Sequence, residues 1–434
     1  MVVIYGRYLR RNGYSIGMGG LGFMEVFDRF RYSEEVYEVS LRGSSVEVNH
    51  VNNTVYGVRF ISDRGLVVVS SNRPDKEFLD SLMYRAGKLS MATGSFNWCV
   101  GNVFHGRVSI GSDKGIDPLI DLVKYVYGEI VGKGLKGEVI GVYRRMSRYH
   151  MLYDGGEALE ERILYELYIY PYTMYMGRLV STSKLIGWCD PGTLYDRVDE
   201  VLESIYREIV SKARARRLNP VYSGKWYVVL TGDASPVLYH EITHLLQADE
   251  PVKLPLGYSF EARINMIEEP FHRGPLQRLF DDEVYPAWKR VLVEDGSVID
   301  YLHTRSTAGE GSKPGNARGL FTRPKPLHYQ LIVRHGDWGF EEMLFESKRS
   351  LVVESIIEAK LGGNYIWIYP ENTYVAEKDQ LTPVKTDLVA IPLDRLQHII
   401  IGLGREQHDR YSFERGYPIY EKAPYTLVEA RVFI

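Results

Sequence analysis

Residues 225–250, KWYVVLTGDASPVLYHEITHLLQADE, carry the clearest structural pattern in the chain. Residues 226–230 are apolar and largely β-branched, which predicts a buried strand, and Thr-Gly-Asp at 231–233 is typical of a turn. Ser235 then offers an oxygen that can cap a helix, and Pro236 suits the first helical position because it lacks the N–H that would stay unpaired there. A helix is therefore predicted to begin here.

His240, Glu241 and His244 fall on this helix. Side chains four residues apart emerge on one face, so the two histidines can reach a single metal ion. Glu241 is rotated about 100° from the first histidine, which leaves it beside the metal. A catalytic zinc keeps a position open for water, and a neighbouring carboxylate can accept that water's proton. We therefore predict His240 and His244 as zinc ligands and Glu241 as the general base of a hydrolytic site.

The third ligand of a catalytic zinc is less explicit in the sequence. His408 lies just after an apolar run, where a loop could deliver its imidazole to the helix. Glu269 is the alternative, because residues 265–269 have the Asn-x-x-x-Glu spacing of a thermolysin-type second helix. The residues themselves leave this choice open.

Composition excludes several classes of protein. The 434 residues are 45% hydrophobic and 25% charged, as in soluble globular proteins, and a formal charge of −3 provides no basic field for nucleic acid. The cysteines, Cys99 and Cys189, are too few for a disulfide framework. No apolar run is long enough to cross a membrane, and the first residues reverse the order of a secretory signal. We expect a soluble cytoplasmic protein without nucleic-acid or membrane partners.

The pattern along the chain predicts an α+β fold with two domains. The first, residues 1–218, is expected to combine a sheet with helices, and the second, 219–434, to be β-rich around the metal-binding helix. Turn residues are expected at 42–43 and 52–53. Helices are expected over 75–91, 117–131 and 193–217, and strands over 35–70, 139–175, 291–293, 330–333, 365–368 and 398–401. Residues 17–22 match G-x-G-x-x-G but lack the βαβ setting of a nucleotide site, so we expect a loop.

The strand, glycine turn and HEITH helix, followed by Gln-Ala-Asp at 247–249, resemble the signature of the TldD/PmbA family. Further segments resemble family motifs in the same order along the chain: 55–59, 75–91, 281–283, 291–296, 301–302, 315–318 and 374–385. The resemblance implies a cytoplasmic zinc peptidase that acts on small or unfolded peptides. It also implies a homodimer, or a heterodimer with a related subunit that lacks the metal motif.

Two departures from the family pattern concern the metal site. The family usually has three residues between its histidines, whereas only Ile242 and Thr243 intervene here. The family's third ligand is a cysteine near the C-terminus, but no cysteine follows Cys189. His408 falls near the equivalent place and is therefore our predicted third ligand. Two rival interpretations remain: a non-catalytic assembly or peptide-binding subunit with a structural metal site, and a thermolysin-type peptidase that uses Glu269.

Overall fold

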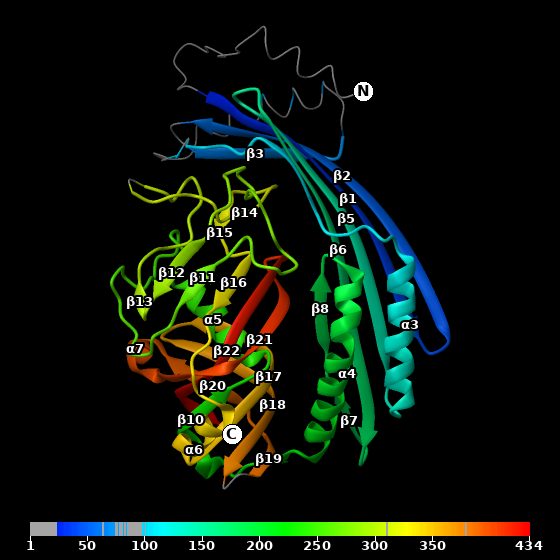
Figure 1. Cartoon of the computed structure of the whole chain (residues 1–434), viewed down its shortest axis with the longest axis vertical. Helices are drawn as coiled ribbons and strands as arrows, with labels where there is room; N and C mark the ends of the chain where they lie inside the picture. Colours follow the sequence, from blue (N-terminus) through cyan, green and yellow to red (C-terminus); the bar gives the residue numbers. More distant parts are fainter. Residues whose placement is uncertain are drawn as a thin grey trace.

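The computed structural model describes residues 24–62, 65–73, 98–99, 101–309, 311–377 and 380–434, with the single residues 77, 81 and 84. Its strands form two large sheets, of eight and twelve strands, and one small two-stranded sheet. Figure 1 shows the long strands of the first sheet curving along one side of the molecule, with the second sheet on the other side and α4 and β8 between them.

The first sheet is built from long, mostly antiparallel strands in the order β3-β2-β1-β5-β6-β4, and β7 and β8 also pair with β6. Its strands are β1 (Met24–Arg42), β2 (Ser45–Ser62), β3 (Gly65–Ser71), β4 (Gly106–Ile110), β5 (Lys136–Leu152), β6 (Glu157–Tyr175), β7 (Arg178–Ser181) and β8 (Lys184–Trp188).

Two helices, α3 (Asp117–Gly132) and α4 (Pro191–Arg214), pack on this sheet. The apolar side chains of α3 recur every three or four residues, so they form one buried stripe. Gly141 of β5 permits the close approach, because a Cβ there would lie 2.8 Å from the side chain of Leu119. Helix α4 begins after Asp190, whose carboxylate accepts a hydrogen bond from the backbone N–H of Thr193.

The second sheet surrounds β10, which pairs with β17 in parallel and with β22 in antiparallel orientation. Its strands are β9 (Arg216–Arg217), β10 (Gly224–Leu230), β11 (Met266–Glu268), β12 (Arg290–Glu294), β13 (Ser297–Val298), β16 (Gln330–Val333), β17 (Arg349–Gly362), β18 (Tyr365–Glu377), β19 (Gln380–Lys385), β20 (Leu388–Pro392), β21 (Ile400–Glu414) and β22 (Tyr417–Phe433). The remaining elements are α5 (Ala234–His244), α6 (Phe340–Ser347), α7 (Leu396–Ile399), the 3₁₀ turns Pro220–Tyr222 and Leu393–Arg395, and the strand pair β14 (Ala317–Arg318) and β15 (Lys325–Pro326).

Most of the predicted elements within the described residues are confirmed, including the helix at 117–131 and the strand-rich region 139–175. Three details were wrong. Of the strand expected over 398–401, residues 398 and 399 belong to α7, and only 400 and 401 lie in β21. Asn52 and Asn53 do not turn but continue β2, where each pairs with a residue of β1. The helix expected over 193–217 ends at Arg214, because Arg216 and Arg217 pair with β19 instead.

Other expectations are only partly covered or not tested. Of the helix expected over 75–91, residues 77, 81 and 84 are described and are helical, whereas residues 17–22 lie outside the described ranges. The division into domains at residue 218 stays a prediction. Within the part of the chain described above, no helix is both long enough and apolar enough to cross a membrane.

Buried charged side chains join the two sheets. Arg59 and Asp28 of the first sheet are fully buried and form an ion pair, in which Nε of Arg59 lies 2.7 Å from a carboxylate oxygen of Asp28. The same guanidinium donates to the backbone carbonyl of Asp282. Burial raises the pKa of Asp28, but Arg59 and His150 outweigh this effect and hold the pKa well below its usual value. The contact between the sheets therefore includes ions that must stay paired, because an unpaired buried charge is costly.

We predict that Arg59→Met destabilises the protein by about 3–5 kcal/mol, since it leaves the Asp28 carboxylate buried without its main partner. The matched control is Arg217→Met. Its ion pair with Asp387 spans 2.6 Å, but the two side chains are 64% and 55% exposed, so the loss should stay below about 1 kcal/mol. Denaturant unfolding measures both variants, and equal losses would contradict the role of the buried pair.

Candidate metal centre

Nearly all side chains of helix α5 are buried, and several pack in the core of the second sheet. Gly232 in the preceding turn has φ +44°, and a Cβ there would lie 2.4 Å from the carbonyl oxygen of Glu354, so the turn requires glycine. Leu238, Tyr239 and Ile242 enter the main core from the helix. The helix begins at Ala234, so the predicted cap, Ser235, lies within its first turn and donates a hydrogen bond to the carbonyl of Pro424 instead.

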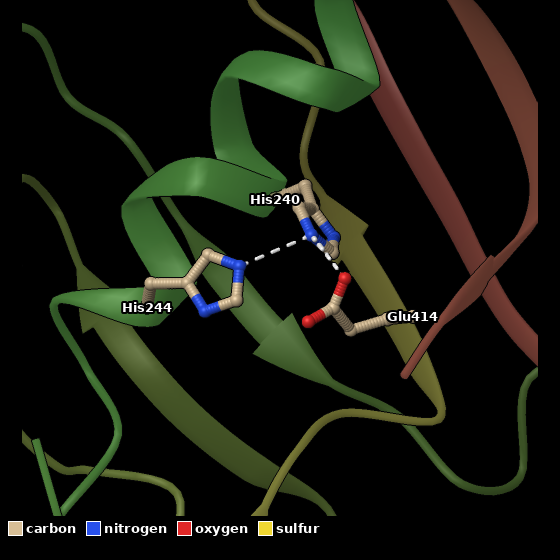
Figure 2. A group of neighbouring side chains, drawn as sticks. All are labelled: His240, His244 and Glu414. Carbon is tan, nitrogen blue, oxygen red and sulfur yellow. Dashed lines mark hydrogen bonds and ion pairs between the residues drawn. The ribbon is translucent and has the colours of Figure 1, made fainter. Parts of the chain in front are cut away.

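The two histidines of α5 converge as the spacing predicted. Nε2 of His240 and Nε2 of His244 are 3.2 Å apart, and a carboxylate oxygen of Glu414 lies 3.7 Å from Nε2 of His240. Figure 2 shows Glu414 reaching this pair from the end of a strand of the second sheet. One ligand atom from each of the three residues lies within 4.8 Å of the others.

A second layer of side chains orients His240. Its Nδ1 lies 2.6 Å from Oε1 of the buried Glu421, which also accepts a contact from Nε2 of His328 at 3.0 Å. Arg410 binds the other oxygen of Glu421 at 2.8 Å. When Nδ1–H of His240 donates to this carboxylate, Nε2 is left available as a ligand, which is the usual outer arrangement around a metal-binding histidine.

His408, the predicted third ligand, is not brought to this group. It lies within β21, and its Nε2 is 3.2 Å from Oδ1 of Asp233, the residue that precedes α5. Asp233 also binds Lys184 of β8 at 2.8 Å. Because Asp233 is seven residues before His240, the contact is about 10 Å along the helix from the paired histidines. The structure thus places His408 at the wrong end of α5 to share a metal with His240 and His244.

Glu269, the alternative third ligand, also lies elsewhere. Its carboxylate forms an ion pair with Lys289 at 3.2 Å. It follows β11 and is not part of a second helix, so the thermolysin-type arrangement that motivated it does not form.

Comparisons with known proteins indicate a metallopeptidase family. Residues 223–430 match the model of the PmbA/TldA metallopeptidase C-terminal domain. A metalloprotease of Methanocaldococcus jannaschii is 24% identical over 362 residues, which are 76% of this chain and 78% of the relative. TldE of Thermococcus kodakarensis has a TM-score of 0.73 at 13% identity and covers 99% of this chain and 98% of its own. The family model, the metalloprotease relatives and the fold together support the TldD/PmbA family for this chain.

Two further likenesses add detail. A metalloprotease of Synechocystis sp. is 35% identical over 150 residues, 31% of each chain. A structure described as a proposed modulator of a DNA gyrase from Thermotoga maritima has a TM-score of 0.74 at 16% identity and covers 95% of this chain and 96% of its own. At such low identity the structures show the fold alone, a mixed, sheet-rich fold. The metalloprotease relatives imply a metal ion in the family.

The donor set of His240, His244 and Glu414 fits a zinc ion. Nitrogen ligands at 2.0–2.1 Å from a tetrahedral zinc are about 3.4 Å apart, and the two histidine nitrogens here are separated by 3.2 Å. Glu414 supplies a carboxylate oxygen, which zinc also accepts. Three protein ligands would leave a fourth position for water or substrate.

The surroundings of the site raise the pKa of His240 and lower the pKa of His244. Burial lowers the pKa of His240, but the carboxylates of Glu421 and Glu414 outweigh burial and raise the pKa to about 9. Burial, together with the charge of His240, holds the pKa of His244 well below its usual value. In the metal-free protein at neutral pH, His240 is therefore charged and His244 neutral.

Glu241, the predicted general base, is 4% exposed. Burial raises the pKa of its carboxyl group. The charge of His240 and a hydrogen bond from the backbone of Leu361 lower this pKa. Glu414 acts on the same carboxyl group and raises its pKa. Glu241 is thus electrostatically coupled to the histidine group but is not one of the three residues whose ligand atoms converge.

Sequence reasoning missed Glu414, Glu421 and His328. Glu421 offered a readable signal, because it lies in the mostly apolar run 417–433 and a charge buried in such a strand needs a partner. Glu414 offered no signal in the sequence, because nothing distinguishes it from other glutamates before a turn. Only the folded hairpin brings it to α5.

We predict that zinc binding at pH 7 releases about one proton. His240 carries that proton in the metal-free protein because its pKa is about 9, and a ligand nitrogen must be deprotonated. The affinity for zinc should therefore rise about tenfold per pH unit from neutral pH and level off near pH 9. Calorimetry in two buffers of different ionisation enthalpy measures the released proton. A binding enthalpy that is the same in both buffers would contradict this assignment.

Proposed function

We propose that this chain is a zinc-dependent peptidase that hydrolyses small or unfolded peptides. His240, His244 and Glu414 would hold the zinc, and Glu241 would be the general base. The observation that carries the proposal is the convergence of two histidine nitrogens, 3.2 Å apart, with a carboxylate from a distant strand. The metalloprotease relatives support the reaction class.

Zinc, when bound, would lower the pKa of a water molecule and polarise the scissile carbonyl group. Glu241 accepts a proton from the attacking water and passes it to the leaving amine. The carbonyl carbon thus gains a hydroxyl group as its bond to nitrogen breaks. Glu421 keeps the Nδ1 proton of His240 and so directs Nε2 toward the metal group.

The rival function is a non-catalytic subunit whose metal only stabilises an assembly or a peptide-binding surface. A structural zinc site has four protein ligands, whereas the group around His240 and His244 provides three within 4.8 Å. The buried carboxylate of Glu241, which is electrostatically coupled to His240 and Glu414, also favours catalysis, since a structural site has no need of it.

Pairing with a second copy or with a related subunit that lacks the metal motif stays a prediction, as does the cytoplasmic location. The activity tests are therefore designed for the isolated chain and for a mixture with such a subunit. Metal tests need only the isolated chain.

We predict that Glu414→Gln lowers the affinity for zinc by more than the 10- to 100-fold that loss of an outer partner typically costs. His240→Ala should abolish zinc binding. His408→Ala and Glu269→Ala are the controls and should keep their zinc, because both side chains bind other residues of the fold. Competition against a chelator measures all four variants. If His408→Ala loses its zinc and Glu414→Gln does not, the sequence-based choice of third ligand is right and ours is wrong.

We predict that Glu241→Gln keeps its zinc and its fold but hydrolyses unstructured peptides at least about 100-fold more slowly, because glutamine cannot accept the water's proton. Mass spectrometry follows cleavage of the peptides, and metal analysis confirms the zinc content. Equal rates for the wild-type protein and Glu241→Gln would contradict the mechanism. Absence of cleavage by the wild-type protein in every assembly would favour the non-catalytic subunit.

A further inference from the structure

The turn that carries Glu414 into the metal centre is unusual. Strands β21 and β22 form a hairpin whose last pair is Glu414 with Tyr417, so Arg415 and Gly416 form a two-residue loop. Their φ angles are +53° and +80°, the positive pair that a type I′ turn requires. Asparagine, aspartate or glycine is favoured at the first of these positions. An arginine is strained there, and such strain points to a role for its side chain.

The guanidinium of Arg415 lies beside the metal centre. Its Nε is 3.3 Å from Oε1 of Glu414, and one terminal nitrogen is 3.9 Å from Oε1 of Glu250. Its charge also lowers the pKa of His244. The side chain is 40% exposed. Arg415 therefore combines contact with a proposed metal ligand and access from solvent.

These two contacts leave N–H groups of the guanidinium able to donate further hydrogen bonds. The approach to Glu250 is too long for a hydrogen bond, and the group has five N–H donors in a planar fork. A planar fork fits a carboxylate with two parallel hydrogen bonds. The group that this position can recognise is therefore a further carboxylate arriving from solvent.

We propose that Arg415 binds the C-terminal carboxylate of the peptide substrate, so that the enzyme releases the last residue of the chain. This inference rests on the proposed peptidase function. Consecutive residues are about 3.8 Å apart, so the terminal carboxylate is close to the metal when the last peptide bond is the one attacked. Arg415 contacts the proposed metal ligand Glu414, so its guanidinium is positioned to bind that carboxylate. The backbone around an internal peptide bond has no such charged group.

The test compares one unstructured peptide with a free C-terminus and the same peptide with a C-terminal amide. Their dissociation constants are measured on the Glu241→Gln protein, which should not cut them, and kcat/KM is measured on the protein with Glu241 intact. Charge-assisted hydrogen bonds are worth about 10- to 100-fold in binding. We expect a preference of this size for the free acid, in both quantities.

Arg415→Gln and Arg415→Asn should bring the acid-to-amide ratio close to one while zinc content stays stoichiometric. Asparagine also suits the positive φ, so Arg415→Asn should unfold no more readily than the wild-type protein, which separates the side chain's role from the turn's stability. Arg263→Gln, at an exposed position outside the metal centre, is the matched control and should keep the ratio of the wild-type protein.

Three outcomes would overturn this proposal: equal binding of acid and amide by the protein with Arg415 intact, an unchanged ratio in both Arg415 variants, or loss of zinc from those variants. If the Arg415 variants lower kcat/KM equally for both peptides, Arg415 interacts with the reacting carbonyl group and not with the terminal carboxylate. If no peptide is cut, the peptidase function fails, but the dissociation constants still decide whether Arg415 recognises a terminal carboxylate.

Discussion

The ion pair between Glu421 and His240 is the interaction on which the candidate metal centre depends. Glu421 is fully buried, and its oxygens are shared among His240, His328 and Arg410. Burial alone would raise the pKa of this carboxyl group, but its cationic partners hold the pKa well below the usual value. The resulting fixed negative charge orients the imidazole of His240 through Nδ1 and raises the pKa of the ring.

The same principle, buried charges that must remain paired, also operates between the two large sheets. Arg59, Asp28 and the backbone of Asp282 join strands of the first sheet to the segment after β11. At the start of α5, Lys184 of the first sheet and His408 of the second both bind Asp233. Helix α5 is thereby tied to both sheets, so a change in how the sheets pack would alter its first turn.

His408 shows why the third ligand could not be chosen from the sequence. Both His408 and Glu414 lie on β21, and only the register of the hairpin decides which residue reaches the histidines. That register places Glu414 in the last pair before the turn and leaves His408 opposite Ala423. The helix capping prediction was wrong for a related reason, because Ser235 found a partner in Pro424 of the neighbouring strand.

The amino-acid pattern alone predicts the buried strand β10, the turn at Gly232 and a helix that carries His240, Glu241 and His244. These features are local, since they follow from residues at most a few positions apart, whose spacing sets the face they share. Three features emerge only from the folded chain: Glu414 joins the histidines, Glu421 orients His240, and Arg415 contacts Glu414. These residues arrive from strands paired over long sequence separations, and no local pattern encodes the register of that pairing.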